Sequence, residues 1–559
     1  MSMVLIWVGL RRLVERQMAK RKRTSLEYLI LGTLCCVLAA AFKYPNRAFL
    51  TRARPDLKKK TIRGLPLIGN LHEFVIYHED QLEMLHHMFQ IYGDVVSLTI
   101  PVFGRGIVIN TPELMEYVLK TNFDNYVKGE IFRQQLTDIL GRGIFVSDGD
   151  EWRFHRKTAS NIFTTKFYRS LVRGAFRASA DDLCTVIDTH IACDQPIDLQ
   201  GHFLKLTLDA FGKLTFGIDF GALAQPGIKN EFGDAFDFLT AAADSRISNP
   251  FWPITDRLIP GRWKKHWGCI HTLHRYAAQA VSARRAETPA EKEARQRDLL
   301  DHFISYTNDD GSILTDLELK DVFVNFLVAG RDTTAQGLTW QFYSLMANPR
   351  VMRNLVQEID HVLKGSTENM TYEVLQNGMP YAKAVFHETL RLHPPVPKNI
   401  KQAVADDVLP DGTRVYAGDF IGYSNWCMGR NKTVWGEDAE QFVPERWLVP
   451  DPENRASFGK FKPESQYKFV SFNAGPRLCL GQQFAILEAL VTTCALLQRY
   501  HFRLTPNHPV PQVKGSVTLP MKKPLMAIVS RRTDGPVPAS IPLSKTTEGP
   551  LESQFARES

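Results

Sequence analysis

Apolar positions recur at helical spacing over long stretches of the chain. From Gln482 to Arg499 they fall at every third or fourth residue, which predicts an amphipathic helix. A longer stretch begins with the capping box Thr315-Asp316-Leu317-Glu318 and ends near Asn348-Pro349. At about 30 residues it far exceeds the average of roughly 11–12, so we predict a buried helix that crosses the whole domain. Residues 170–310 are also mostly helical by pattern.

Shorter stretches have the composition of strands and turns. Asp94 to Asn110 is rich in valine and isoleucine and predicts a strand pair around the turn Phe103-Gly104-Arg105-Gly106. Pro410-Asp411-Gly412 is a turn signal between strand-like residues. Long helices with a few short strands predict a mainly α fold with small β-sheets, in the α+β class.

The most apolar stretch lies near the N-terminus. Leu26 to Phe42 follows Lys20-Arg21-Lys22-Arg23 and spans about 17 residues, the lower limit for crossing a bilayer. We therefore predict a basic N-terminal segment over 1–23 and a transmembrane anchor over 24–42. Basic residues lie on both sides of the anchor, so charge alone does not set its orientation.

The remaining chain divides by composition. Residues 43–64 form a basic linker ending in proline and glycine, 65–532 a large catalytic domain, and 533–559 a polar, proline-containing tail that we expect to be disordered. Much of the net charge of +8 lies beside the anchor, where it favours lipid headgroups. No zinc spacing or RNA-binding signature supports a nucleic-acid partner. The eight cysteines form no paired framework, which predicts reduced thiols facing the cytosol.

Candidate chemistry gathers at Phe472–Gly481, which contains a single cysteine. Cys479 precedes the start of a helix, where free N–H groups favour a thiolate. Gly475 and Gly481 let the backbone approach something large and flat, and Arg477 can meet an anion. A haem needs these features: a soft anionic ligand, room for the macrocycle and a cation for a propionate. The alternative is that Cys479 is a small buried apolar residue.

The spacing Phe-x-x-Gly-x-Arg-x-Cys-x-Gly decides between these interpretations. It fixes five residues and should arise by chance in about one of 10,000 chains of this length. The pattern resembles the haem-binding loop of the cytochrome P450 family, the haem-thiolate monooxygenases, and so implies the cytochrome P450 fold. The resemblance makes Cys479 the iron ligand. It assigns the haem contacts of this loop to Phe472, Gly475, Arg477 and Gly481.

A second haem contact is predicted at Trp152 and Arg156, four residues apart and therefore on one helical face. Alone, the two residues form an ordinary aromatic–cation pair. Beside the cysteine loop they resemble the family's second propionate clamp, in which an indole N–H and a guanidinium donate to one carboxylate.

The centre of the long helix, Ala329-Gly330-Arg331-Asp332-Thr333-Thr334, is poorly suited to a buried helix interior. These residues make sense if the helix opens locally to hand protons across a pocket. The stretch resembles the family's oxygen-activation motif. By that match Asp332 relays protons from solvent, Thr333 hydrogen-bonds the oxygen being activated, and Ala329 faces the haem. In animal fatty-acid omega-hydroxylases this position often holds a glutamate, which can bond covalently to the haem. Ala329 cannot form that bond, so we predict non-covalent haem b.

A structural network is predicted from Glu388 and Arg391, one helical turn apart. Alone they indicate a surface ion pair. They resemble the family's Glu-x-x-Arg motif, which Arg446 completes, and such a network locks the chain before the haem loop.

The resemblance covers about Leu65 to Arg532. Three local stretches are similar to the branch that acts on fatty acids and alkanes, which includes plant and fungal omega-hydroxylases: Phe123–Gly129, Asp407–Gly412 and Met428–Arg430. The resemblance implies a membrane-anchored monooxygenase that hydroxylates such a chain at or near its end. It places the protein in the endoplasmic reticulum membrane as a single-pass protein with its catalytic domain in the cytosol.

The chain leaves no region for flavin or nicotinamide. The resemblance therefore implies electrons from NADPH-cytochrome P450 reductase, with cytochrome b5 as a further partner. Three alternatives stay open: a steroid or xenobiotic hydroxylase on the same fold, an oxygen-independent haem-thiolate isomerase or dehydratase, and a haem sensor. The last two have no need of the Asp332–Thr333 pair. Lys128 is a candidate for holding a substrate carboxylate, although an exposed loop lysine is the simpler interpretation.

Overall fold

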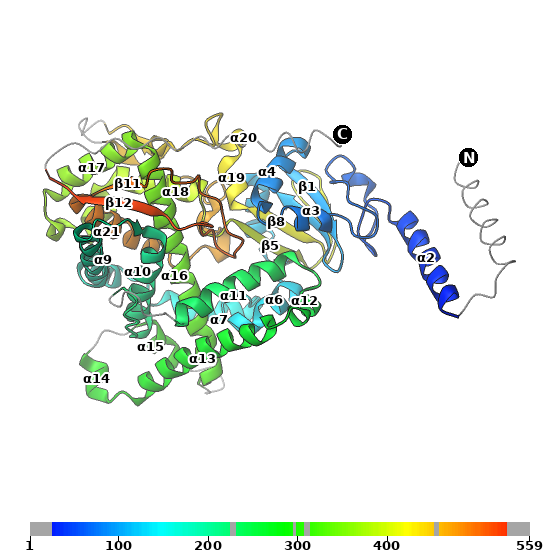
Figure 1. Cartoon of the computed structure of the whole chain (residues 1–559), viewed down its shortest axis with the longest axis horizontal. Coiled ribbons are helices and arrows are strands. Elements are labelled where there is room, and N and C mark those ends of the chain that lie inside the picture. Colours follow the sequence, from blue (N-terminus) through cyan, green and yellow to red (C-terminus); the bar gives the residue numbers. More distant parts are fainter. Residues whose placement is uncertain (1–24, 224–230, 295–297, 307–312, 452–457, 534–559) are drawn as a thin grey trace.

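The computed structural model describes residues 25–223, 231–294, 298–306, 313–451 and 458–533. The basic segment predicted over 1–23 and the tail predicted over 533–559, apart from its first residue, lie outside this part of the chain. Figure 1 shows one large body, from which the helix α2 projects.

Helices make up most of the body, as predicted. They are α2 Ser25–Lys43, α3 Leu71–Ile76, α4 Gln81–Tyr92, α5 Pro112–Glu116, α6 Glu130–Leu140, α7 Gly149–Ser160, α8 Thr165–Arg173, α9 Ala175–Ala192, α10 Leu199–Phe216, α11 Glu231–Ser248, α12 Trp252–Leu258, α13 Arg262–Ala286, α14 Pro289–Ala294, α15 Leu299–Ile304, α16 Asp316–Ala347, α17 Pro349–Leu363, α18 Pro380–Leu392, α19 Asn425–Arg430, α20 Lys432–Trp435 and α21 Gln482–Arg499. The two helices predicted around 315–348 and 482–499 are confirmed as α16 and α21.

The strands are short and form small sheets. They are β1 Val95–Ile100, β2 Gly104–Ile109, β3 Tyr126–Val127, β4 Ile197–Asp198, β5 Lys398–Ala403, β6 Asp407–Val408, β7 Arg414–Val415, β8 Phe420–Ser424, β9 Leu448–Val449, β10 Lys460–Phe461, β11 Tyr500–Leu504 and β12 Met526–Arg531. The largest sheet has the order β1-β2-β8-β5-β3, in which only β2 and β8 run parallel. It lies at the end of the body next to α2 (Figure 1).

The predicted strand pair around residue 100 is confirmed as the β1–β2 hairpin, but its turn was misplaced. Gly104 already pairs with Ile100 and Arg105 with Thr99, so the turn lies at residues 101–103. Val102 there adopts a left-handed conformation, with a φ of 69°. The turn predicted at 410–412 is confirmed between β6 and β7, and Gly412 supplies its positive φ.

The centre of the body is α16, which packs against α10, α13, α18 and α21. Its N-terminus carries the predicted capping box: Thr315 accepts from the N–H of Glu318, and Glu318 accepts from the N–H of Thr315. Most of the helix is buried, including polar residues along its length. α16 is therefore a core element, and a polar side chain on it needs a partner or a function.

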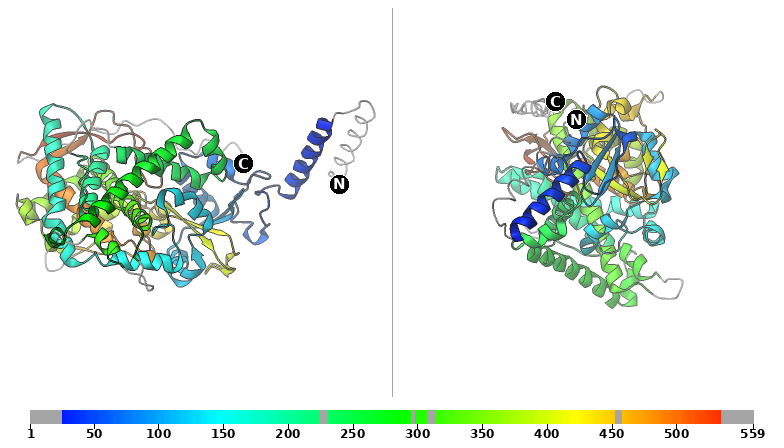
Figure 2. Two further views of the ribbon diagram at one scale, coloured as in Figure 1. Left: turned by 90° about the horizontal axis from the view of Figure 1, so that it is seen from below. Right: turned by 90° about the vertical axis from the view of Figure 1, so that its right-hand side faces the viewer.

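The N-terminal helix α2 projects away from the body, as the left view of Figure 2 shows. Many of its apolar side chains are exposed, among them Leu29, Ile30, Leu34 and Phe42. Within the described ranges, no helix combines the length and the apolar character needed to cross a membrane. The stretch predicted as an anchor is thus helical from Ser25 onward, whereas a membrane span is not confirmed.

Candidate functional site

The cysteine loop leads directly into α21. The N–H of Cys479 donates to the carbonyl of Phe472 at 2.8 Å, which closes the loop. The Cys479 side chain is accessible, yet surrounding protein desolvates it and raises the pKa of its thiol. The N–H of Gly481 and the charge of Arg156 act in the opposite direction. Desolvation therefore opposes the effect that is predicted for the helix terminus. A bound metal deprotonates such a thiol outright.

The two glycines of this loop have different roles. Gly475 has a φ of 63°, and a Cβ there would lie 2.1 Å from the carbonyl oxygen of Leu119. Glycine is thus required for the loop to pack against residues 117–121. Gly481 has an ordinary φ of −85°, and an added Cβ would contact only the sulfur of Cys479, at 3.9 Å. Protein packing therefore accounts for Gly475, and the approach of both glycines to a large flat group stays a prediction.

The two predicted propionate clamps come together in one cluster. The Arg477 guanidinium lies over the Trp152 ring at 4.6 Å and donates to Asp148 at 2.8 Å. Arg156 donates to the carbonyl of Leu478 at 2.6 Å. Helix α7 is in this way joined to the cysteine loop, and two guanidinium groups and an indole gather beside Cys479.

Two lysines that sequence reasoning did not assign to the haem site complete this cluster. Lys401 on β5 is buried, and its Nζ has no hydrogen-bond partner among the described residues. Burial lowers its pKa strongly, and the cations of Lys128 and Arg477 lower it further. Lys128 lies over the Phe132 ring, and burial lowers its pKa to about 8. The interpretation of Lys128 as an exposed loop lysine is wrong.

The cluster fits a haem. Lys128, Lys401 and Arg477 are basic groups, and Asp148 is the one acidic group among those that act on Lys401. The Arg477 Nε, like the Lys401 Nζ, is buried without a hydrogen-bond partner among the described residues. An anion with two carboxylates would satisfy these groups. Beside them lies an accessible thiol of the kind that binds iron.

We expect Lys401→Met to weaken haem retention. A hydrogen bond to a charged group contributes about 1.5–3 kcal/mol, so haem should transfer to apomyoglobin roughly ten to a hundred times faster. The apoprotein should become more stable to denaturant, since an unpaired buried amine is removed. Lys398→Met is the matched control, because Lys398 lies on the same strand but pairs with Asp244. Equal haem loss in both variants would contradict the assignment.

The centre of α16 stays a continuous α-helix, so the predicted local opening is not observed. Gly330 instead permits close packing, because a Cβ there would lie 2.0 Å from the ring of Phe211 on α10. The carbonyl of Arg331 accepts a hydrogen bond from Thr207 at 2.8 Å. A close contact with α10 therefore accounts for Gly330, one of the residues that were expected to break the helix.

Asp332 and Thr333 differ in their surroundings. Asp332 is buried, and this burial raises the pKa of its carboxyl to about 6, although the adjacent Arg331 cation favours the charged form. Thr333 donates to the carbonyl of Ala329 at 2.6 Å. Ala329 and Thr333 are only half-buried, unlike most of this helix. They share one face, which neighbouring helices leave uncovered.

The predicted structural network forms around Glu388. Its carboxylate accepts from Arg391 Nε and Nη2, both at 2.8 Å, and from Arg446 Nε at 2.9 Å. The indole of Trp447 and the N–H of Val443 complete its partners. Arg391 in turn donates to the carbonyls of Gly429, Ala439 and Gln441. The network thus fixes the chain between α19 and β9, ahead of the cysteine loop.

Two of the stretches that resemble the lipid-hydroxylating branch contact each other. Asp407 accepts from Tyr117, Asn122 and Tyr126, at 3.0, 2.9 and 2.6 Å. The end of the first stretch reaches the haem cluster, because the N–H groups of Lys128 and Gly129 donate to Asp148. These local motifs therefore shape one wall beside the cysteine loop.

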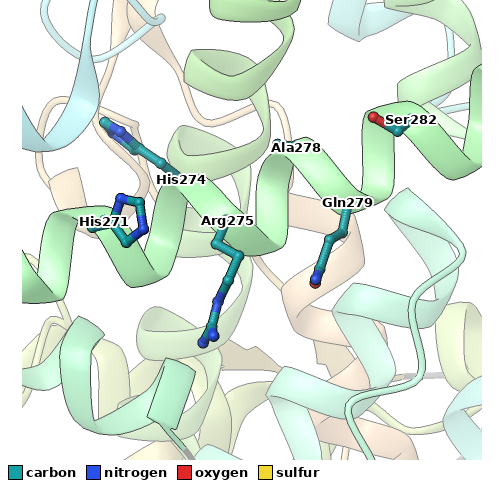
Figure 3. A pocket seen from close by; sticks show the side chains of 6 residues that line it. All are labelled: His271, His274, Arg275, Ala278, Gln279 and Ser282. Carbon is teal, nitrogen blue, oxygen red and sulfur yellow. The ribbon is translucent and has the colours of Figure 1, made fainter.

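A separate hollow lies on the outer side of α13. Figure 3 shows that all six side chains lining it come from this one helix: His271, His274, Arg275, Ala278, Gln279 and Ser282. None belongs to the haem cluster or to the centre of α16. Arg275 pairs with Glu231 at 2.7 Å. We assign this hollow no part in the chemistry.

Comparison with known proteins identifies the family. The cytochrome P450 family model matches residues 60–528. The chain is 37% identical to cytochrome P450 monooxygenase cyp1 of Mycosarcoma maydis over 542 residues, 94% of this chain and 82% of that protein. It is 35% identical to cytochrome P450 704B1 of Arabidopsis thaliana over 509 residues, 84% of this chain and 94% of that protein. It is 34% identical to cytochrome P450 86B1 of the same plant over 505 residues, 85% of this chain and 87% of that protein.

The chain therefore belongs to the cytochrome P450 family of haem-thiolate monooxygenases. The predicted fold family, enzyme class and haem b cofactor are confirmed. Members generally receive electrons from an NADPH reductase and act on lipophilic substrates.

Proposed function

We propose that this monooxygenase hydroxylates a fatty acid or an alkane at or near the chain end. The observation that carries the proposal is the wall beside the cysteine loop, where Tyr126 and Asp407 bind each other at 2.6 Å. Both lie in stretches similar to the lipid-hydroxylating branch. The branch includes omega-hydroxylases of fungi and plants, and the relatives of this chain come from a fungus and a plant.

In this proposal the haem, when bound, supplies thiolate-supported cleavage of the O–O bond. Cys479 is its ligand, and Phe472 and Gly481 shape the loop around it. Trp152, Arg156, Arg477 and Lys401 hold its carboxylates. The haem is non-covalent, since Ala329 has no group that can bond to it. Asp332 holds and passes protons, and Thr333 positions the group that receives them.

We expect Thr333→Ala to uncouple electron use from product. The hydroxyl is worth about one hydrogen bond, so product formed per NADPH should fall about tenfold while NADPH oxidation continues. Thr339→Ala is the control, because Thr339 makes the same bond to the carbonyl four residues earlier on α16. Unchanged coupling in Thr333→Ala would favour the oxygen-independent isomerase or dehydratase.

Product analysis tests the substrate class. Purified protein with NADPH-cytochrome P450 reductase, with and without cytochrome b5, is given medium- and long-chain fatty acids, an alkane, a steroid and an aromatic xenobiotic. We expect terminal or near-terminal hydroxylated chains. Steroid or xenobiotic products alone would retain the monooxygenase and overturn the lipid assignment.

We further propose that α2 attaches the protein to the endoplasmic reticulum membrane, with the catalytic domain in the cytosol. Exposed Leu29, Leu34 and Phe42 give α2 an apolar surface that water does not favour. Basic residues in the linker after α2 can contact anionic lipid. Full-length protein should remain with membranes after alkaline extraction, and recovery in the soluble fraction would contradict the attachment.

A further inference from the structure

One arginine on α16 binds two carboxylates from different helices. Arg331 Nη1 donates to Asp332 at 2.7 Å and to Asp237 of α11, also at 2.7 Å. Because both oxygens lie at hydrogen-bond distance from one nitrogen, they can be no further apart than twice that distance. One water molecule bridges such a gap. The two carboxylates are thus close enough to exchange a proton through a single water.

The three groups run from the surface to the interior. The side chain of Asp237 is 49% exposed, whereas those of Arg331 and Asp332 are each 5% exposed. The neighbouring Phe236, also on α11, covers the Arg331 guanidinium with its ring at 5.1 Å. Asp237 therefore gives the buried Asp332 a neighbouring carboxylate that is in contact with solvent.

We propose that Asp237 on α11 is the solvent-side proton carrier that supplies Asp332, and that Arg331 holds the two carboxylates in place. The proposal deepens the proposed oxygen-activating role of Asp332 and rests on it. Asp237 takes a proton from solvent and gives it to the bridging water, which gives one of its own protons to Asp332. Arg331 keeps its proton throughout, since a guanidinium is not deprotonated in proteins. No electron moves in this step.

The position of α11 controls this route. The contact between Asp237 and Arg331 joins two helices that are separate in the chain, so it exists only while α11 keeps its present position. The charged groups that act on Asp332 are Arg331 on its own helix and Asp237 on α11. From α21, Glu488 faces the nearby Thr334. Movement of α11 would therefore remove a proton donor from Asp332 while leaving Arg331 beside it.

The test uses holoenzyme with reductase, NADPH and the fatty-acid mixture, and measures product per NADPH and the solvent deuterium isotope effect. Asp237→Asn removes the proton carrier with little change in shape, and we expect about tenfold less product per NADPH and a larger isotope effect. Asp237→Glu should restore both quantities. Asp234→Asn is the matched control, since Asp234 is exposed on the same helix. Substrate-induced spectral shifts should be the same in all variants.

Asp332→Asn is measured alongside to separate the two proposals. If it lowers coupling while Asp237→Asn behaves like Asp234→Asn, the carrier role of Asp237 is overturned and that of Asp332 stands. If Asp332→Asn has no effect, both roles are wrong. If Asp237→Asn loses substrate binding without a change in isotope effect, Asp237 only joins the two helices and is not a proton carrier. Hydrogen peroxide release is recorded in every sample, so that an unsuitable substrate is not mistaken for a failed relay.

Discussion

Replacing Glu388 by glutamine is expected to destabilise the protein by about 3–5 kcal/mol, the cost of removing one partner from a buried ion pair. Glu388 and Arg391 are both fully buried. Glutamine keeps the shape of the side chain but leaves the charge of Arg391 without its bidentate partner. Domains unfold with only about 5–15 kcal/mol, so this loss is a large fraction of the total. Denaturant unfolding of purified protein, with haem content recorded, measures it.

Glu445→Gln is the control for this prediction. Glu445 adjoins Arg446 in sequence and pairs with Arg350, but the pair is partly exposed. Exposed ion pairs contribute about 0–1 kcal/mol, so the control should remain close to the parent protein. Aggregation or failed haem incorporation of Glu388→Gln alone also agrees with the prediction. A Glu388→Gln protein as stable as Glu445→Gln would show that the network does not support the fold.

Replacing Cys479 by serine is expected to abolish turnover and the thiolate-ligated spectrum. Serine is close in size, but its hydroxyl is not a soft anionic ligand. Loss of a residue that supports a metal ligand lowers metal affinity or activity about 10–100-fold. Loss of the ligand itself should therefore lower activity by more than about 100-fold. The measurement is the difference spectrum of the reduced protein with carbon monoxide, together with product formation.

Cys193→Ser is the control for cysteine removal, because Cys193 is exposed at the end of α9. It should keep both the spectrum and the turnover. A Cys479→Ser protein that retains the thiolate spectrum would require another cysteine as ligand. The cationic cluster around Arg477 would then have to serve a different anion.

Much of the fold follows from local signals. The capping box and the long, mainly apolar run predict α16, and the spacing after Gly481 predicts α21. Parts of the candidate site could also be predicted from the sequence where their residues lie close together along the chain, as in the cysteine loop and in the Ala329–Thr334 stretch. These predictions hold because helices and tight loops are set by neighbours along the chain.

The parts that sequence reasoning missed depend on tertiary contacts. Lys401 lies on β5, whose buried positions are Lys401 and Ala403. Because one of the two is charged, the alternation of apolar and polar residues does not indicate that Lys401 is buried. Asp237 gains its partner only through a tertiary contact, in which its side chain on α11 meets Arg331 on α16. The raised pKa of the Cys479 thiol likewise reflects the protein around the loop rather than the adjacent helix terminus.

The most direct test of the account is the origin of the oxygen in the product. Purified enzyme, reductase and NADPH are given the fatty-acid mixture under isotopically labelled dioxygen, and the products are analysed by mass spectrometry. The account predicts one labelled oxygen atom at or near the end of the chain. A product without labelled oxygen, such as a rearranged or dehydrated substrate formed without NADPH, would contradict the monooxygenase chemistry assigned to Cys479, Asp332 and Thr333.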